Sequence, residues 1–224
     1  VRIKIVDSDA SFPNVFVISD QVKIVGSINV TDPPAGTYMN VSGSSLVKWT
    51  KTGSFSTVNI WASTNGGSSY TTEVTPSVSA GALQYNWTGI PAVPSNNVVI
   101  RVADNADPAT LGVSPLVSHI HRIYDITTPD GGEVLGVGSP QDITWTTVGG
   151  TTANVKLQYA TNGGGTAGNW VDIPGAENLV NSNPKTFSWT VPNVISTTAK
   201  VRVVDLSDTD NWNESGTQNN PTQG

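Results

Sequence analysis

The same series of short sequence patterns occurs twice in this chain, about 100 residues apart. LVKWT (Leu46–Thr50) returns as DITWT (Asp142–Thr146), and VVIRVAD (Val98–Asp104) returns as AKVRVVD (Ala199–Asp205), at offsets of 96 and 101 residues. A period of this length is that of a whole domain and is too long for a solenoid unit. The chain must therefore fold into two related domains, and a string of near-copies favours a mechanical or spacing role.

The repeat also predicts the domain boundaries. VRIKIVD (Val1–Asp7) resembles the strand that ends each copy, so residues 1–21 are expected to be the last strands of a preceding copy. The first full domain is then expected at residues 22–120 and the second at residues 121–224. The opening residues indicate an internal piece of a larger protein, whose targeting segment would lie elsewhere.

Within each copy, apolar and polar residues alternate with a period of two. Ile143 and Trp145 point one way and Thr144 the other, which is the pattern of a half-buried β-strand. About seven such strands in about 100 residues predict an all-β fold of tandem immunoglobulin-like β-sandwich domains. Two tryptophans per copy lie on the apolar faces and are expected in the cores: Trp49 with Trp87, and Trp145 with Trp189.

Composition excludes several classes of function. The chain has no cysteine, so it cannot form disulfides, thiolate zinc sites or cysteine nucleophiles. Its eleven basic residues are scattered and its net charge is −6, which argues against nucleic-acid binding. No apolar run approaches the length of a membrane span. An acidic surface of this kind suits an extracellular or cell-surface location.

One stretch carries a family resemblance. PDGGEVLGVGSPQDITWT (Pro129–Thr146) resembles the opening of the immunoglobulin-like repeats of large bacterial and archaeal cell-surface proteins. These repeats are related to the Ser/Thr-rich domain of fungal cell-wall-synthesis proteins. Asp130 stands where the family usually has Asn, and Leu135 where it has Trp. The resemblance implies a non-catalytic extracellular module, found in tandem in adhesins, surface layers (S-layers) and appendages of secreted enzymes.

Acidic loops follow the penultimate strand of each copy, and in a sandwich of this type they would face the preceding domain. Carboxylates that converge at a junction suit Ca²⁺, which binds six to eight oxygens. No cofactor is required, but Ca²⁺ could stiffen the string. Asp-rich turns formed for backbone reasons are the alternative. The candidate calcium ligands are Asp7, Asp9, Asp104, Asp107, Asp205, Asp208 and Asp210.

Aromatic side chains outside the predicted cores suggest a second kind of site. Trp61 is out of phase with the apolar residues of its strand and should face outward. Flat exposed rings can stack on sugars, so Trp61, Tyr70, Trp170 and Trp212 are candidate carbohydrate-binding residues. The alternative is that these rings cover hairpins or pack on a neighbouring domain.

Two further features concern histidine and asparagine. His119 and His121 lie two apart on one face of the strand between the domains, where two imidazoles could hold a metal ion, although the sequence shows no third ligand. A polar face on the linking strand is the other interpretation. Four asparagines begin glycosylation triplets: Asn29, Asn40, Asn86 and Asn213.

Catalytic motifs are missing: the chain has no GxSxG or HExxH, and its four glutamates are scattered. The sequence therefore predicts a structural, non-catalytic module that acts as a spacer, a surface-layer lattice element or an adhesin stalk. Its expected partners are neighbouring immunoglobulin-like domains, copies of itself, or a cell-surface polysaccharide. The alternative is a pair of carbohydrate-binding modules attached to a secreted enzyme.

The two copies end differently. Gly112–Ile123 is an apolar final strand, whereas the corresponding Asn213–Gly224 is polar and lacks alternation. The second domain is therefore expected to keep an open sheet edge, or to pair with the residues 1–18 of another molecule.

Overall fold

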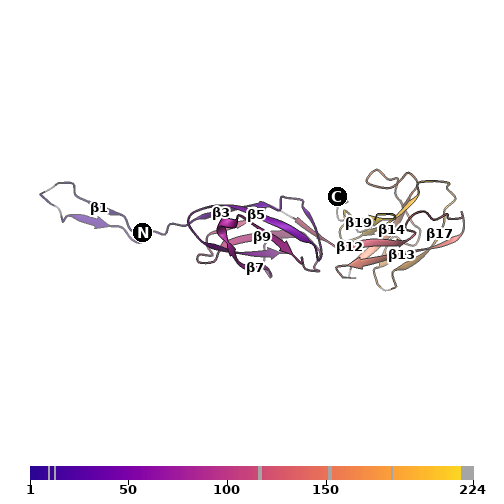
Figure 1. Ribbon diagram of the computed structural model, residues 1–224, viewed down its shortest axis with the longest axis horizontal. Coiled ribbons are helices and arrows are strands. Elements are labelled where there is room, and N and C mark those ends of the chain that lie inside the picture. The colour runs from indigo at the N-terminus through magenta and orange to yellow at the C-terminus, as the bar shows by residue number, and fades with distance from the viewer. Residues whose placement is uncertain (10, 13, 116–117, 151–152, 183, 218–224) are drawn as a thin grey trace.

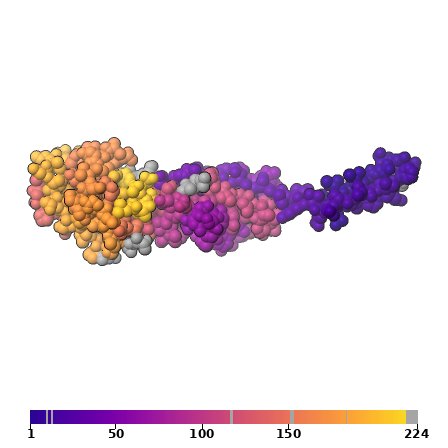
Figure 2. All heavy atoms as spheres, turned by 180° about the vertical axis from the view of Figure 1, so that it is seen from behind, coloured from indigo at the N-terminus to yellow at the C-terminus, as the bar shows by residue number. Residues whose placement is uncertain are grey.

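The chain forms two β-sandwiches in a row, preceded by a short hairpin (Figure 1). The computed structural model describes residues 1–9, 11–12, 14–115, 118–150, 153–182 and 184–217. The three units follow one another along a single long axis, as both the ribbon and the space-filling view show (Figure 2). Among the described residues, no helix has the length and apolar character needed to cross a membrane.

Two sheets build the first sandwich. One has the order β3-β5-β8, and the other has the order β4-β11-β9-β6-β7, with β10 also paired to β9. β4 and β11 pair in parallel, whereas the other pairs are antiparallel. The strands are β3 (Ser27–Asp32), β4 (Tyr38–Asn40), β5 (Ser44–Thr52), β6 (Thr57–Ser63), β7 (Thr72–Ser79), β8 (Gln84–Thr88), β9 (Ser95–Asp104), β10 (Leu111–Val113) and β11 (Ser118–His121), with the 3-10 turn η1 at Ala80–Ala82.

The second sandwich repeats this plan. One sheet has the order β12-β13-β17, and the other β15-β14-β18-β19, with β16 paired to β14. The predicted all-β fold of tandem immunoglobulin-like sandwiches is therefore confirmed. The strands are β12 (Ile123–Thr128), β13 (Pro140–Val148), β14 (Asn154–Ala160), β15 (Val171–Asp172), β16 (Leu179–Val180), β17 (Thr186–Thr190), β18 (Lys200–Asp205) and β19 (Trp212–Glu214).

The tryptophans fill the two cores, as their place on the apolar faces predicts. Trp49, Trp87, Trp145 and Trp189 are all buried among aliphatic side chains of both sheets. A buried indole N–H requires a hydrogen-bond acceptor, and the two domains supply different ones. The Trp49 Nε1 donates to the backbone oxygen of Ala80 at 3.2 Å, whereas the Trp145 Nε1 donates to the Asn181 Oδ1 at 3.1 Å.

The domains differ most at their last strand. In the first sandwich β11 lies between β4 and the first residues of β9, with Ser118 opposite Val98. In the second, β19 pairs with β18 as β10 pairs with β9. No strand of the described residues occupies the place that corresponds to β11, so the predicted open edge is present in that part of the chain. The rest of the predicted final strand, residues 218–224, lies outside the described residues.

The N-terminal hairpin pairs β1 (Lys4–Val6) with β2 (Phe16–Ile18). Its apolar side chains are exposed on both strands, because a two-stranded sheet has no second layer to cover them. The hairpin has the sequence of a strand pair from a sandwich but stands alone (Figure 1).

We predict that Asn181→Ala will lower the free energy of unfolding of the second domain by about 1–3 kcal/mol, because it leaves the buried Trp145 N–H without an acceptor. Asn178→Ala is the matched control, since Asn178 is exposed and bonds only Asn154 in the described structure. Urea denaturation followed by tryptophan fluorescence measures both. Equal losses for the two variants would contradict the assignment.

Candidate functional site at the seam between the domains

The two sandwiches are joined without a linker. β11 ends at His121 and β12 begins at Ile123, so that Arg122 alone separates the last strand of one domain from the first strand of the next. Gly149, in a turn of the second domain, lies so close to Val41 of the first that an added Cβ would be 3.0 Å from its Cγ1. Such contacts leave the junction little freedom to bend.

A buried ion pair lies at this boundary between the two domains, which we call the seam. The Arg122 Nη1 is 2.7 Å from the Oδ2 of Asp205, which ends β18, and both side chains are buried. The same oxygen accepts a hydrogen bond from the Tyr124 hydroxyl at 3.0 Å, while the other oxygen accepts from the backbone and hydroxyl of Ser207. Burial, followed by the charge of Asp205, raises the pKa of Tyr124 far above its usual range. Both carboxylate oxygens of Asp205 therefore have partners among residues at or next to the domain boundary.

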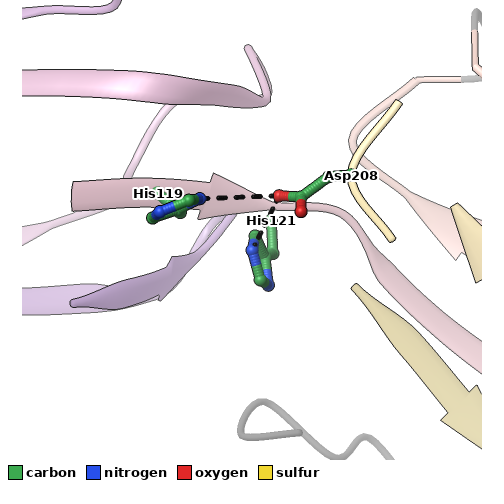
Figure 3. Close-up of side chains that lie close together, drawn as sticks. All are labelled: His119, His121 and Asp208. Carbon is green, nitrogen blue, oxygen red and sulfur yellow. Dashed lines mark ion pairs between the residues drawn. The ribbon is translucent and has the colours of Figure 1, made fainter. Parts of the chain in front are cut away.

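Beside the ion pair, three metal-ligating side chains meet across the seam. His119 and His121 project from the same face of β11, and Asp208 reaches them from the loop after β18 (Figure 3). The Asp208 Oδ2 lies 2.9 Å from the His121 Nε2 and 3.7 Å from the His119 Nδ1. The sequence provided the histidine pair but not the third ligand, because Asp208 comes from the other domain.

Tyr38 forms one wall of this cluster. Its ring centroid lies 4.9 Å from that of His119 and 4.6 Å from that of His121. Burial, then the negative charges of Asp210 and Asp208, raises the pKa of Tyr38. Next to the cluster lies a cleft of about 250 Å³, whose walls include Asn96 and Ile120 from the first domain and Ser207 and Asn211 from the second. The Asn96 amide donates to the Ser207 backbone oxygen at 3.5 Å.

The other acidic residues of the loops serve the backbone. Asp7, Asp104 and Asp205 each accept a hydrogen bond from the backbone N–H two residues later, as Asp turns do. Asp9 does the same with Ser11. Asp107 forms an ion pair with Lys23 at 2.7 Å.

In the part of the chain that the structure describes, the only group of three possible ligands is His119, His121 and Asp208. The calcium site stays a prediction, without a cluster of three carboxylates to support it in those residues.

The four candidate carbohydrate-binding residues lie in separate domains: Trp61 and Tyr70 in the first, and Trp170 and Trp212 in the second. The exposure predicted for one of these residues is wrong. Trp212 is only 8% exposed, so the prediction of an exposed ring at this position is wrong. The Arg202 guanidinium lies over both the Trp170 and the Trp212 ring, at 4.3 and 4.9 Å from their centroids, and the two ring centroids are 6.2 Å apart. These contacts cover Trp212. In the first domain Arg101 covers Tyr70 in the same way, at 4.3 Å.

Trp61 is partly exposed on the outer face of β6, beside Arg101 on β9. In Tyr70, Trp170 and Trp212, by contrast, an arginine covers a ring face that a sugar would need. Burial lowers the pKa of Arg202 to about 10, against the opposing effect of Glu214.

The glycosylation candidates differ in solvent exposure. Asn29 and Asn86 are exposed and Asn40 is half-buried. Asn213 is 1% exposed, its Oδ1 accepts from the Ile126 backbone N–H, and its Nδ2 donates to the Thr217 backbone oxygen. The folded domain therefore disfavours glycosylation at Asn213, because the side chain is buried and the amide nitrogen is bonded to Thr217.

Comparison with solved structures finds other two-domain sandwich proteins. The fibronectin(III)-like modules of CbhA from Clostridium thermocellum are 15% identical, with 84% of this chain and 91% of that chain covered and a TM-score of 0.28. A chain of the complex between Dpr2 Ig1-Ig2 and DIP-Theta Ig1-Ig3 is 10% identical, with 84% of this chain and 64% of that chain covered and a TM-score of 0.28. No protein-family model matches the chain, and no curated protein does. These TM-scores are too low to support a fold assignment, so the assignment depends on the strand order described above.

We predict that Arg122→Ala will lower the free energy of unfolding of the second domain by about 3–5 kcal/mol, because it leaves the buried Asp205 carboxylate without its cation. Lys156→Ala is the matched control. It removes a partly exposed ion pair with Asp172 and should change the stability by less than about 1 kcal/mol. Denaturant unfolding measures both, and similar losses would contradict a central role for the buried pair.

Proposed function

We propose that the chain is a non-catalytic structural module of a larger extracellular or cell-surface protein. It sets the spacing and direction of a string of immunoglobulin-like domains, in a spacer, a surface-layer lattice or an adhesin stalk. Its partners are neighbouring immunoglobulin-like domains of the same protein or copies of itself.

The observation that carries this proposal is the seam itself. One residue separates β11 from β12, and that residue forms a buried ion pair with Asp205 of the second domain. Domains joined by flexible linkers move relative to each other. Here the buried ion pair, the Asn96–Ser207 hydrogen bond and the close approach of Gly149 to Val41 all oppose such motion. A fixed angle between successive domains is what a spacer requires and what a catalytic or soluble binding module does not need.

The Arg–aromatic stacks support this proposal over the carbohydrate-binding alternative. Their rings are directed at arginine side chains of their own sheet, so they stabilise the outer surface of each sandwich. The pattern recurs in both copies at equivalent arginines, Arg101 and Arg202, as expected of a structural feature.

We predict that spin labels at Ser77→Cys and Ser188→Cys, one exposed site in each domain, will give a single narrow distance distribution by electron–electron dipolar spectroscopy. The chain has no native cysteine, so labelling is specific. Inserting Gly-Ser-Gly-Ser between His121 and Arg122 should broaden the distribution while both domains stay folded. An equally broad distribution in the unaltered chain would overturn the spacer proposal.

A further inference from the structure

We propose that His119, His121 and Asp208 bind one transition-metal ion of the Zn²⁺ type across the seam. The chain has two histidines in 224 residues, and both lie in this cluster. The ligands come from both domains, two from β11 and one from the loop after β18 (Figure 3). A bound ion would therefore cross-link the sandwiches directly.

The distances suit such an ion. Zn–N and Zn–O bonds of about 2.0–2.2 Å in a tetrahedron place neighbouring ligand atoms roughly 3.3 Å apart. The Asp208 Oδ2 is 2.9 Å from one histidine nitrogen and 3.7 Å from the other, and all three ligand atoms lie within 4.8 Å of one another. Small side-chain rotations are enough to bring the three atoms to one centre.

The same three atoms are buried and lack hydrogen-bonding partners. The Asp208 Oδ2, the His119 Nδ1 and the His121 Nε2 make no hydrogen bond of acceptable alignment, although the last of these is 2.9 Å from the carboxylate. The His121 side chain is 6% exposed and that of Asp208 is 10% exposed. Burying polar atoms without a well-aligned hydrogen bond costs free energy even at ion-pair distance, and a cation between them would satisfy all three.

The donor set selects the class of ion. Two imidazole nitrogens and one carboxylate oxygen favour Zn²⁺ and its neighbours Ni²⁺ and Cu²⁺, whereas Ca²⁺ requires six to eight oxygens. Three protein ligands leave the fourth position of the ion to water. Because Tyr38 packs against both imidazole rings, the histidines are held on one side of the site.

The test is the thermal unfolding of the tag-free full chain in EDTA, in Zn²⁺ and in Ca²⁺. We expect a Zn²⁺-dependent increase in Tm of several degrees, with no effect of Ca²⁺, since an ion that binds only the folded state stabilises it. Calorimetric titration should give one Zn²⁺ per chain.

Two ligand variants and one control complete this test. His119→Gln and Asp208→Asn should each lose the Zn²⁺-dependent shift and weaken binding at least tenfold. Asp142→Asn, at an exposed position of β13 away from the cluster, should keep both. The absence of a Zn²⁺ shift in the unaltered chain, or an equal shift in His119→Gln, would overturn the proposal.

A separate observation, the open edge of the second domain, carries a second inference. We infer that this edge accepts residues 21–26 of a second copy, so that copies join head to tail. This inference rests on the proposed structural function and specifies the partner as another copy of this chain.

The edge is a groove shaped like the place that β11 fills in the first domain. It has a volume of about 540 Å³ and lies between Glu133–Leu135 on one side and Ser196–Ala199 on the other. By the repeat offsets these segments correspond to β4 and to the first residues of β9, the two neighbours of β11. Val134, on the side of the groove that corresponds to β4, is 98% exposed.

The walls of the groove are already formed. The Glu133 carboxylate accepts backbone N–H groups from Asp130 and Gly131, both at 2.7 Å, which closes the turn that leads into one wall. On the other side the Ser196 hydroxyl donates to the Thr161 backbone oxygen, as the Ser95 hydroxyl donates to that of Thr64 in the first domain. A strand that binds in the groove would therefore pair with two segments whose backbone is already held in place by these hydrogen bonds.

The segment before β3 aligns with β11 by the repeat offset. Ile24 stands 96 residues before Ile120, the buried centre of β11, yet Ile24 is 77% exposed in its own molecule. Lys23, equivalent to His119, contacts Asp107 at the entry end of the first domain, as His119 contacts Asp208 at the seam. Insertion of Ile24 into the groove would therefore recreate the seam between two copies.

Disulfide trapping tests this arrangement on the full chain. Val22→Cys with Ala199→Cys, the counterparts of the facing residues Ser118 and Val98, should give intermolecular disulfides and a ladder of dimers and longer chains under mild oxidation. Val22→Cys with Ser77→Cys, which places the second thiol on a distant exposed strand, should not. Adding Ile24→Asp to the first pair should reduce the ladder at least tenfold.

A monomer at every concentration, with no ladder from the first pair, would overturn the inference. The spacer proposal would stand in that case, because the interdomain distance within one chain is measured separately.

Discussion

The Arg122–Asp205 ion pair is the interaction on which the rest of the seam depends. A buried carboxylate is costly unless it is paired and fully hydrogen-bonded, and Asp205 meets this condition through Arg122, Tyr124 and Ser207. These contacts fix the start of the loop after β18. The loop in turn brings Asp208 to the histidines and Ser207 to Asn96. One ion pair thus couples the end of a strand in the second domain to the boundary between the domains.

The repeat and the alternation of apolar residues were enough to predict the sandwiches and their tryptophan cores, since both depend on short-range pattern. Contacts between domains were not predictable in this way. Asp208 follows His121 by 87 residues, and nothing in either local sequence indicates that they meet. Trp212 was wrongly expected at the surface for a similar reason, because its burial requires Arg202 on the neighbouring strand to lie against it.

The two copies use equivalent positions for different chemistry. Where the entry end of the first domain has Lys23 and Asp107, the seam has His119 and Asp208. A lysine–carboxylate pair is held by charge and a hydrogen bond, whereas a histidine pair can also accept a metal ion. The comparison shows that the position serves to hold the preceding segment, and that only the second seam has acquired ligands suited to coordination.

The position of β11 has a consequence for how such chains can grow. This strand completes the core of one domain, yet its histidines and the adjoining Arg122 act in the contact with the next. The first folded domain and the contact between the two domains therefore share one strand, β11. Exchange of a whole copy during recombination preserves its core but separates each boundary strand from the loop that recognises it. Selection on such a protein would act on each boundary strand together with the loop that it contacts. Adjacent domains would therefore be inherited together.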